Sequence, residues 1–172
     1  MDIKTLFGLP AHPFLVHIPV VLIPLCAIGA LGMVWKPWRD RFGWAIAVIL
    51  AAAGILTQLA IGSGQALQRT SERNALVRAH TSIAEEIRPW LLLFFIALVA
   101  LLWLERRRSP HDDTTNGNLL RDPLLIALFS ATVTLGAVSV YWVQRIGHSG
   151  AQAVWHDRNR QRDNGQGERP GE

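Results

Sequence analysis

Residues Phe14–Trp35 read FLVHIPVVLIPLCAIGALGMVW, an apolar run interrupted only by His17 and two prolines. A helix needs about 20 mostly apolar residues to cross the hydrocarbon layer of a bilayer. This stretch meets that requirement, so it predicts a membrane-spanning helix and decides the class of fold.

Three further apolar segments follow along the chain. Trp44–Ile61 and Pro123–Ile146 are long enough to span a membrane. The apolar core of the remaining segment, Trp90–Leu104, is too short for a layer of about 30 Å at about 1.5 Å per residue. We therefore expect the third helix to include the preceding residues AHTSIAEEIRP.

The segments predict an all-α integral membrane protein, a four-helix up-down-up-down bundle. The expected helices are about 13–35, 44–66, 80–104 and 122–146, within a single transmembrane domain of residues 1–155. Residues 36–43 (KPWRDRFG) are expected to form a short loop, and Gly62-Ser63-Gly64 to end the second helix. Residues 156–172 (HDRNRQRDNGQGERPGE) have almost no apolar side chains, which predicts a disordered polar tail.

The distribution of charge fits a membrane protein. The 172 residues are 50% hydrophobic and carry a formal net charge of +4. The basic residues cluster beside the apolar segments, where they anchor helices and meet anionic headgroups, so we exclude a nucleic-acid partner and expect the lipid bilayer. The basic blocks KPWRDR and ERRR share one predicted membrane face with four tryptophans (Trp35, Trp38, Trp44 and Trp103). The positive-inside rule assigns that face to the cytoplasm of a bacterial inner membrane, and both termini to the periplasmic side.

Four of the six histidines fall on the opposite predicted face. His12 and His17 begin the first segment, His80 opens the third, and His148 follows the fourth. Neutral imidazole is a common ligand of metals and haem. The positive end of a helix dipole also disfavours protonation of a histidine in the first turn. The four histidines therefore predict a haem or metal site near the periplasmic face.

Other residues are candidates to complete that site. Gly147 and Gly150 flank His148 and allow a flat ligand or another helix to approach closely. Arg88 is suited to pair with a haem propionate, and Glu85 or Glu86 to orient a ligand histidine or relay protons. Each also has a purely structural interpretation: a glycine C-cap, an interfacial histidine, or a Glu–Arg pair at the membrane surface.

Three functions remain open from these residues. The first is a b-type haem protein for electron transfer, with His17 and His80 as the first axial pair and His12 and His148 serving a second haem or completing the pocket. The second is a copper or zinc site formed by His12, His17, His80 and His148. The third is a non-catalytic membrane subunit of a redox complex. The chain contains no nucleophile–base motif, phosphate loop or CxxC string, so we expect an electron-transfer component rather than a stand-alone enzyme.

The strings HPFLVHIP and IGHSGA resemble a bacterial membrane-protein family known as domain of unknown function 2231. The resemblance covers about residues 10–155, and the matching positions are His12, Pro13, His17, Pro19, His80, Gly147, His148 and Gly150. Members are sometimes joined to Rieske or cytochrome c domains, which implies a redox setting with a quinone or a periplasmic redox protein as partner. After His148 the chain departs from the family pattern, since residues 151–155 (AQAVW) replace a further glycine and an apolar–aromatic pair.

Overall fold

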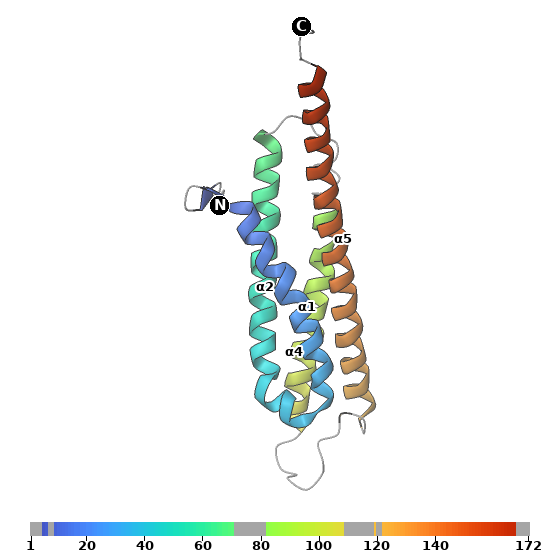
Figure 1. Ribbon diagram of the computed structural model, residues 1–172. Helices are drawn as coiled ribbons and strands as arrows, with labels where there is room; N and C mark the ends of the chain where they lie inside the picture. The colour runs from blue at the N-terminus through green and yellow to red at the C-terminus, as the bar shows by residue number, and fades with distance from the viewer. Residues whose placement is uncertain (1–4, 7–8, 71–81, 109–118, 120–121, 168–172) are drawn as a thin grey trace.

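The chain folds as a bundle of long helices in a computed structural model (Figure 1). The structure describes residues 5–6, 9–70, 82–108, 119 and 122–167, with side chains described over 15–65, 82–108, 119 and 122–152. A small antiparallel pair of strands, β1 (Thr5–Leu6) and β2 (Leu9–Pro10), precedes the bundle. The bundle contains α1 (Ala11–Leu31), the 3-10 helix η1 (Gly32–Val34), α2 (Lys36–Thr70), α4 (Ile87–Arg108) and α5 (Pro123–Gly167).

The described part of the chain holds four helical stretches long and apolar enough to cross a membrane. They are Leu15–Val34, Lys36–Gln65, Ser82–Arg108 and Pro123–Gln152. The third begins before α4, with a helical stretch over residues 82–85 and a turn at Glu86, whose N–H donates to the Ile83 carbonyl at 3.2 Å. The predicted all-α membrane fold with four spans is confirmed, including a third span that begins well before its apolar core.

Each helix packs against two others. α1 contacts α2 and α5, and α4 contacts the same two helices from the other side. Two side-chain contacts show that α2 and α4 run in opposite directions. Arg39 near the start of α2 bonds to Glu105 near the end of α4. Gln65 near the end of α2 bonds to Glu85, just before the start of α4. Figure 1 shows the starts of α1 and α4 at the same end of the bundle as the late part of α2 and α5.

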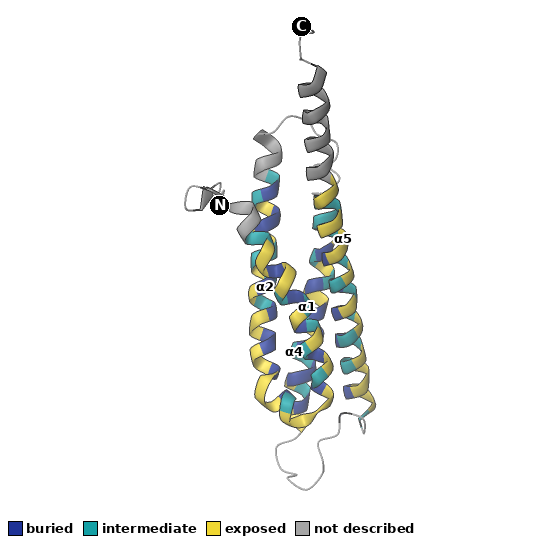
Figure 2. Ribbon diagram, in the orientation of Figure 1, coloured by how far each residue is buried: buried dark blue, intermediate teal, exposed yellow. Residues whose placement is uncertain are grey.

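Burial follows the pattern expected of a membrane bundle. The interior is a narrow column that includes Ile23, Leu50, Phe94 and Leu98, whereas many large apolar side chains face outward. Figure 2 shows buried residues along the facing sides of the helices and exposed ones along the outside. An outer apolar surface suits lipid tails, which are as apolar as the side chains that meet them.

The first connection is tighter than we predicted. Residues 36–43, expected as a loop, form the first turns of α2, and the chain reverses over η1 and Trp35. The Trp38 indole makes this possible: its Nε1–H donates to the Gly29 carbonyl at 3.1 Å, and its ring covers Gly32. The side chain bridges the two helices, so no flexible loop is needed.

Two helices, α2 and α5, extend past the ends that we predicted for the second and fourth spans. α2 continues through Gly62-Ser63-Gly64 to Thr70, and the Ser63 hydroxyl donates to the Ala60 carbonyl at 2.9 Å. α5 continues through His148 to Gly167, so residues 156–167 of the predicted disordered tail are helical. Extension of an existing helix avoids the cost of nucleation, and the arginines and glutamines of the tail have high helix propensity. Single glycines cost only about 1 kcal/mol each within a helix.

Candidate functional site

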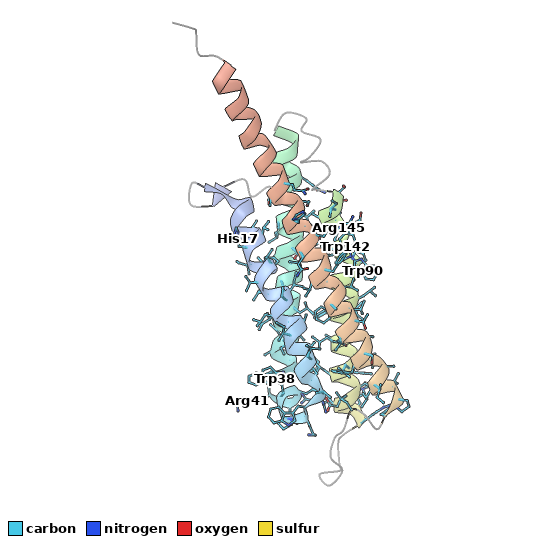
Figure 3. The ribbon with its side chains drawn as sticks, turned by 45° about the vertical axis from the view of Figure 1, so that its right-hand side comes forward. His17, Trp38, Arg41, Trp90, Trp142 and Arg145 are labelled. Atoms are coloured by element: carbon cyan, nitrogen blue, oxygen red, sulfur yellow. The ribbon has the colours of Figure 1, made fainter. Side chains whose placement is uncertain are left out.

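The two ends of the bundle carry different side chains (Figure 3). His17, Trp142 and Arg145 lie toward one end, whereas Trp38 and Arg41 lie at the other. We call the first the histidine end and the second the tryptophan end. The predicted site belongs to the histidine end.

An apolar cavity of about 70 Å³ lies between the helices near the histidine end. All four spans contribute to its wall. The lining residues include Val16, Pro19 and Ile23 of α1, Ala60 and Gly64 of α2, Ala84 and Ile87 of the third span, and Val143 and Ile146 of α5. Small side chains at Ala60, Gly64 and Ala84 leave this space open.

His17 neighbours cavity-lining residues along α1 but does not line the cavity itself. It follows Val16 and precedes Pro19, both of which line the wall, and its side chain is exposed. His12 lies in the first turn of α1, four residues before Val16. The side chain of His12 and the whole of His80 lie outside the described residues.

His148 has a different position from the one expected. It lies inside α5, two residues after Ile146, and is therefore about 200° around the helix from that cavity-lining residue. Its side chain is exposed, and its Nε2 lies 3.1 Å from Nε2 of Gln152. The structure thus brings His17 close to the cavity and turns His148 away from it.

Gly147 and Gly150 do not end a helix, because both lie within α5. A Cβ atom added at Gly147 would meet nothing within 4 Å. The residue is exposed, whereas Gly150 is half-buried. No neighbouring element described in the structure approaches Gly147 closely enough to require a glycine there.

Arg88 lines a second pocket, of about 290 Å³, between α2 and α4. This pocket adjoins the first, since Thr57 lines both. The Arg88 Nε atom is buried and has no hydrogen-bond partner among the residues that the structure describes. The pairing of Arg88 with a haem propionate stays a prediction, and the described guanidinium belongs to the α2/α4 pocket.

The two glutamates before Arg88 differ in their surroundings. Glu85 accepts a hydrogen bond from Nε2 of Gln65 at 2.5 Å, which ties the late part of α2 to the beginning of the third span. Glu86 lies at the turn and is exposed. Their predicted roles in orienting a histidine or relaying protons stay predictions, because His80 is not described.

Within the described ranges, no three His, Cys, Asp or Glu residues are grouped closely enough to hold a metal ion. The predicted zinc or copper site depends on His12 and His80, whose side chains do not belong to those ranges. That site therefore stays a prediction.

A buried ion pair that we did not predict from the sequence lies at the tryptophan end. Arg39 is only 2% exposed. Its Nε–H donates to Oε2 of Glu105 at 2.5 Å, its Nη1–H donates to the Met33 carbonyl at 2.5 Å, and its Nη2 pairs with the other Glu105 oxygen. Arg39 joins the α1–α2 turn to α4. The signal in the sequence was Glu105, a single carboxylate directly after the third apolar segment. A carboxylate at that depth requires a basic partner, which another helix end can supply.

Comparison with known proteins identified one family. Residues 8–162 match a family model described as predicted membrane protein (DUF2231). No curated protein and no solved structure gives a significant match. The matched region covers all four spans and His12, His17, His80 and His148.

Proposed function

Since the chain belongs to the DUF2231 family of predicted membrane proteins, we propose that it is a membrane-bound b-type haem protein for electron transfer. The haem is held by histidines at the histidine end of the bundle. In this proposal that end faces the periplasm, because the short basic blocks lie at the other end.

The observation that carries the proposal is the apolar cavity beside His17. Haem sites in helical bundles combine imidazole ligands with an apolar wall contributed by several helices. The four spans supply such a wall, and small residues at Ala60, Gly64 and Ala84 leave space within it. The cavity alone, at about 70 Å³, is smaller than the roughly 300–1,000 Å³ of small-molecule sites. In this proposal the cavity forms only the inner part of the haem site.

The donor set suits haem iron. His12 and His17 lie in the first two turns of α1, and imidazole is a common ligand of haem iron. The apolar residues around the cavity would exclude water from the bound group. A bound haem supplies one-electron chemistry. Its place near one membrane face suits a quinone or a periplasmic redox protein as partner.

The first test is a dithionite-reduced minus air-oxidised visible spectrum of the purified protein, expressed with adequate haem supply. We expect sharp reduced α and Soret bands. His12→Ala, His17→Ala and His80→Ala are compared with His111→Ala and His156→Ala, which replace histidines outside the proposed site. The bands are expected to be lost or shifted in at least two of the first three variants and unchanged in the two controls. His148→Ala is expected to keep the bands because this side chain points away from the cavity.

A featureless spectrum of the haem-supplied protein contradicts the proposal. Elemental analysis of the same sample then decides between the two alternatives. Stoichiometric copper or zinc favours the histidine metal site, and its absence favours a non-catalytic membrane subunit.

A further inference from the structure

The pocket between α2 and α4 has an amphipathic lining. Its apolar part includes Leu50, Gly54 and Ile55 of α2 and Leu92 and Phe95 of α4. Its polar part, Thr57, Gln58 and Arg88, lies toward the histidine end, because α2 runs toward that end and α4 away from it. From Leu50 to Gln58 the groove extends about 12 Å along α2 at about 1.5 Å per residue. One end of the groove is therefore cationic, and the remainder is apolar.

The charge of Arg88 lacks a counterion among the described side chains. Its Nε is buried without a hydrogen-bond partner there. Glu85, one turn earlier, is bonded to Gln65, and Glu86 is exposed at the turn. An ionised residue within a membrane span is costly and is almost always paired or turned toward water. A buried donor that lacks an acceptor adds a further penalty.

We propose that this groove binds an anionic phospholipid, with its phosphate on Arg88 and an acyl chain along the apolar residues of α2 and α4. Guanidinium groups bind phosphate through charge-assisted, often bidentate hydrogen bonds. Basic pockets between membrane helices bind anionic headgroups. A phospholipid matches both parts of the groove at once, and the bilayer supplies it to a pocket between two lipid-exposed helices. The inference assigns Arg88 to the lipid in place of the haem propionate predicted from the sequence, and it does not depend on a bound haem.

The test uses the full chain, purified in mild detergent and stripped of bound lipid. Thermal unfolding is followed while phosphatidylglycerol, or phosphatidylcholine as the zwitterionic comparison, is titrated. We expect phosphatidylglycerol to raise the unfolding temperature at lower concentration. In Arg88→Gln its apparent affinity is expected to fall about tenfold or more, since hydrogen bonds to charged groups contribute about 1.5–3 kcal/mol. Arg88→Lys keeps the charge but loses the paired donors. Its affinity for phosphatidylglycerol is therefore expected to lie between those of the wild type and Arg88→Gln.

Arg145→Gln is the matched control. Arg145 lies at the same end of the bundle, but it is exposed and stacks on Trp142 with its guanidinium carbon 5.2 Å from the ring centroid. We expect wild-type affinity for phosphatidylglycerol in this variant.

A second variant tests the apolar part of the groove. Ala51 lines the groove and is half-buried, so Ala51→Phe is expected to block the acyl chain and weaken phosphatidylglycerol binding while Arg88 remains. Mass spectrometry of the protein before lipid stripping is expected to show bound anionic phospholipid in the wild type and less in Arg88→Gln. The proposal is overturned if Arg88→Gln and Arg145→Gln respond alike, if phosphatidylcholine acts equally well, or if Arg88→Gln loses a porphyrin or quinone and keeps its phospholipid.

Discussion

The histidine end and the tryptophan end belong to the same four helices but are packed in opposite ways. At the tryptophan end, Arg39 and Glu105 form a buried ion pair, and the Trp38 ring lies directly against Gly32. At the histidine end, two adjoining pockets lie between the helices. A Cβ atom at Gly62 or at Gly147 would meet nothing within 4 Å.

The tryptophan end also has a pocket, but a different one. It measures about 250 Å³ and is lined mainly by charged residues of α2 and α4. Several of those residues are already paired: Arg39 with Glu105, and Lys36 with Asp40 at 2.8 Å. These polar groups of the tryptophan-end pocket therefore pair with one another within the protein. The pockets of the histidine end are mostly apolar, and the Arg88 Nε remains unsatisfied within the described chain. The two ends therefore differ in the chemistry of their pockets: charged and mostly paired at the tryptophan end, and mostly apolar at the histidine end.

The largest expected effect comes from breaking the buried ion pair. Arg39→Ala leaves Glu105 buried without its partner and is expected to lower the free energy of unfolding by about 3–5 kcal/mol. Thermal or denaturant unfolding in detergent measures the change. Lys36→Ala, which removes an exposed pair, is the control and is expected to cost less than about 1 kcal/mol.

A double variant tests whether the loss of stability in Arg39→Ala comes from the unpaired charge of Glu105. Arg39→Leu combined with Glu105→Leu removes both charges, and such replacement of a buried pair is often close to neutral. The double variant is expected to recover much of the stability lost in Arg39→Ala. Equal losses in Arg39→Ala and Lys36→Ala would show that the tryptophan end does not depend on the buried pair.

A smaller effect is expected from two matched glycine substitutions, one at each end. A Cβ at Gly32 would lie 2.5 Å from Nε1 of Trp38, so Gly32→Ala must displace the indole and is expected to cost about 1–3 kcal/mol. Gly62→Ala meets open space within α2 and is expected to be neutral or to stabilise by up to about 1 kcal/mol. Unfolding measurements on both variants test the contrast in packing, and similar values for the two would argue against it.

The smallest expected effect comes from filling the cavity. Ala60→Val adds two methyl groups at the cavity wall and is expected to stabilise the protein by up to about 1 kcal/mol. Ala53→Val makes the same change in the same helix at a fully buried position outside that cavity, and it is expected to destabilise. If haem binds as proposed, Ala60→Val also lowers the amount of haem retained. A destabilisation by Ala60→Val as large as that by Ala53→Val would mean that the cavity has no usable space.

The sequence predicted the spans well and their ends poorly. Apolar length identifies a membrane helix locally, so all four spans were found, including the early start of the third. The ends were misplaced where Gly62-Ser63-Gly64 and the polar tail looked like breaks, although α2 and α5 continue through them. A long helix propagates through weak helix formers because its nucleation has already occurred.

The candidate site stays a prediction, and the sequence located its residues only along the bundle. The depth of His17 follows from its position at the start of an apolar span. The side of α5 on which His148 lies was not predicted, because the helix was expected to end before that residue.

By itself, the sequence determined the class of fold, the four spans, and the side-chain types near each end of the bundle. These properties follow from the length of apolar segments and from position along the chain. The tertiary structure alone decided that Arg39 pairs with Glu105, 66 residues away, that Arg88 faces a groove, and that the cavity opens beside His17. Pairing and enclosed space depend on how closely the helices approach and which sides face each other, and these follow from the packing of all four spans together.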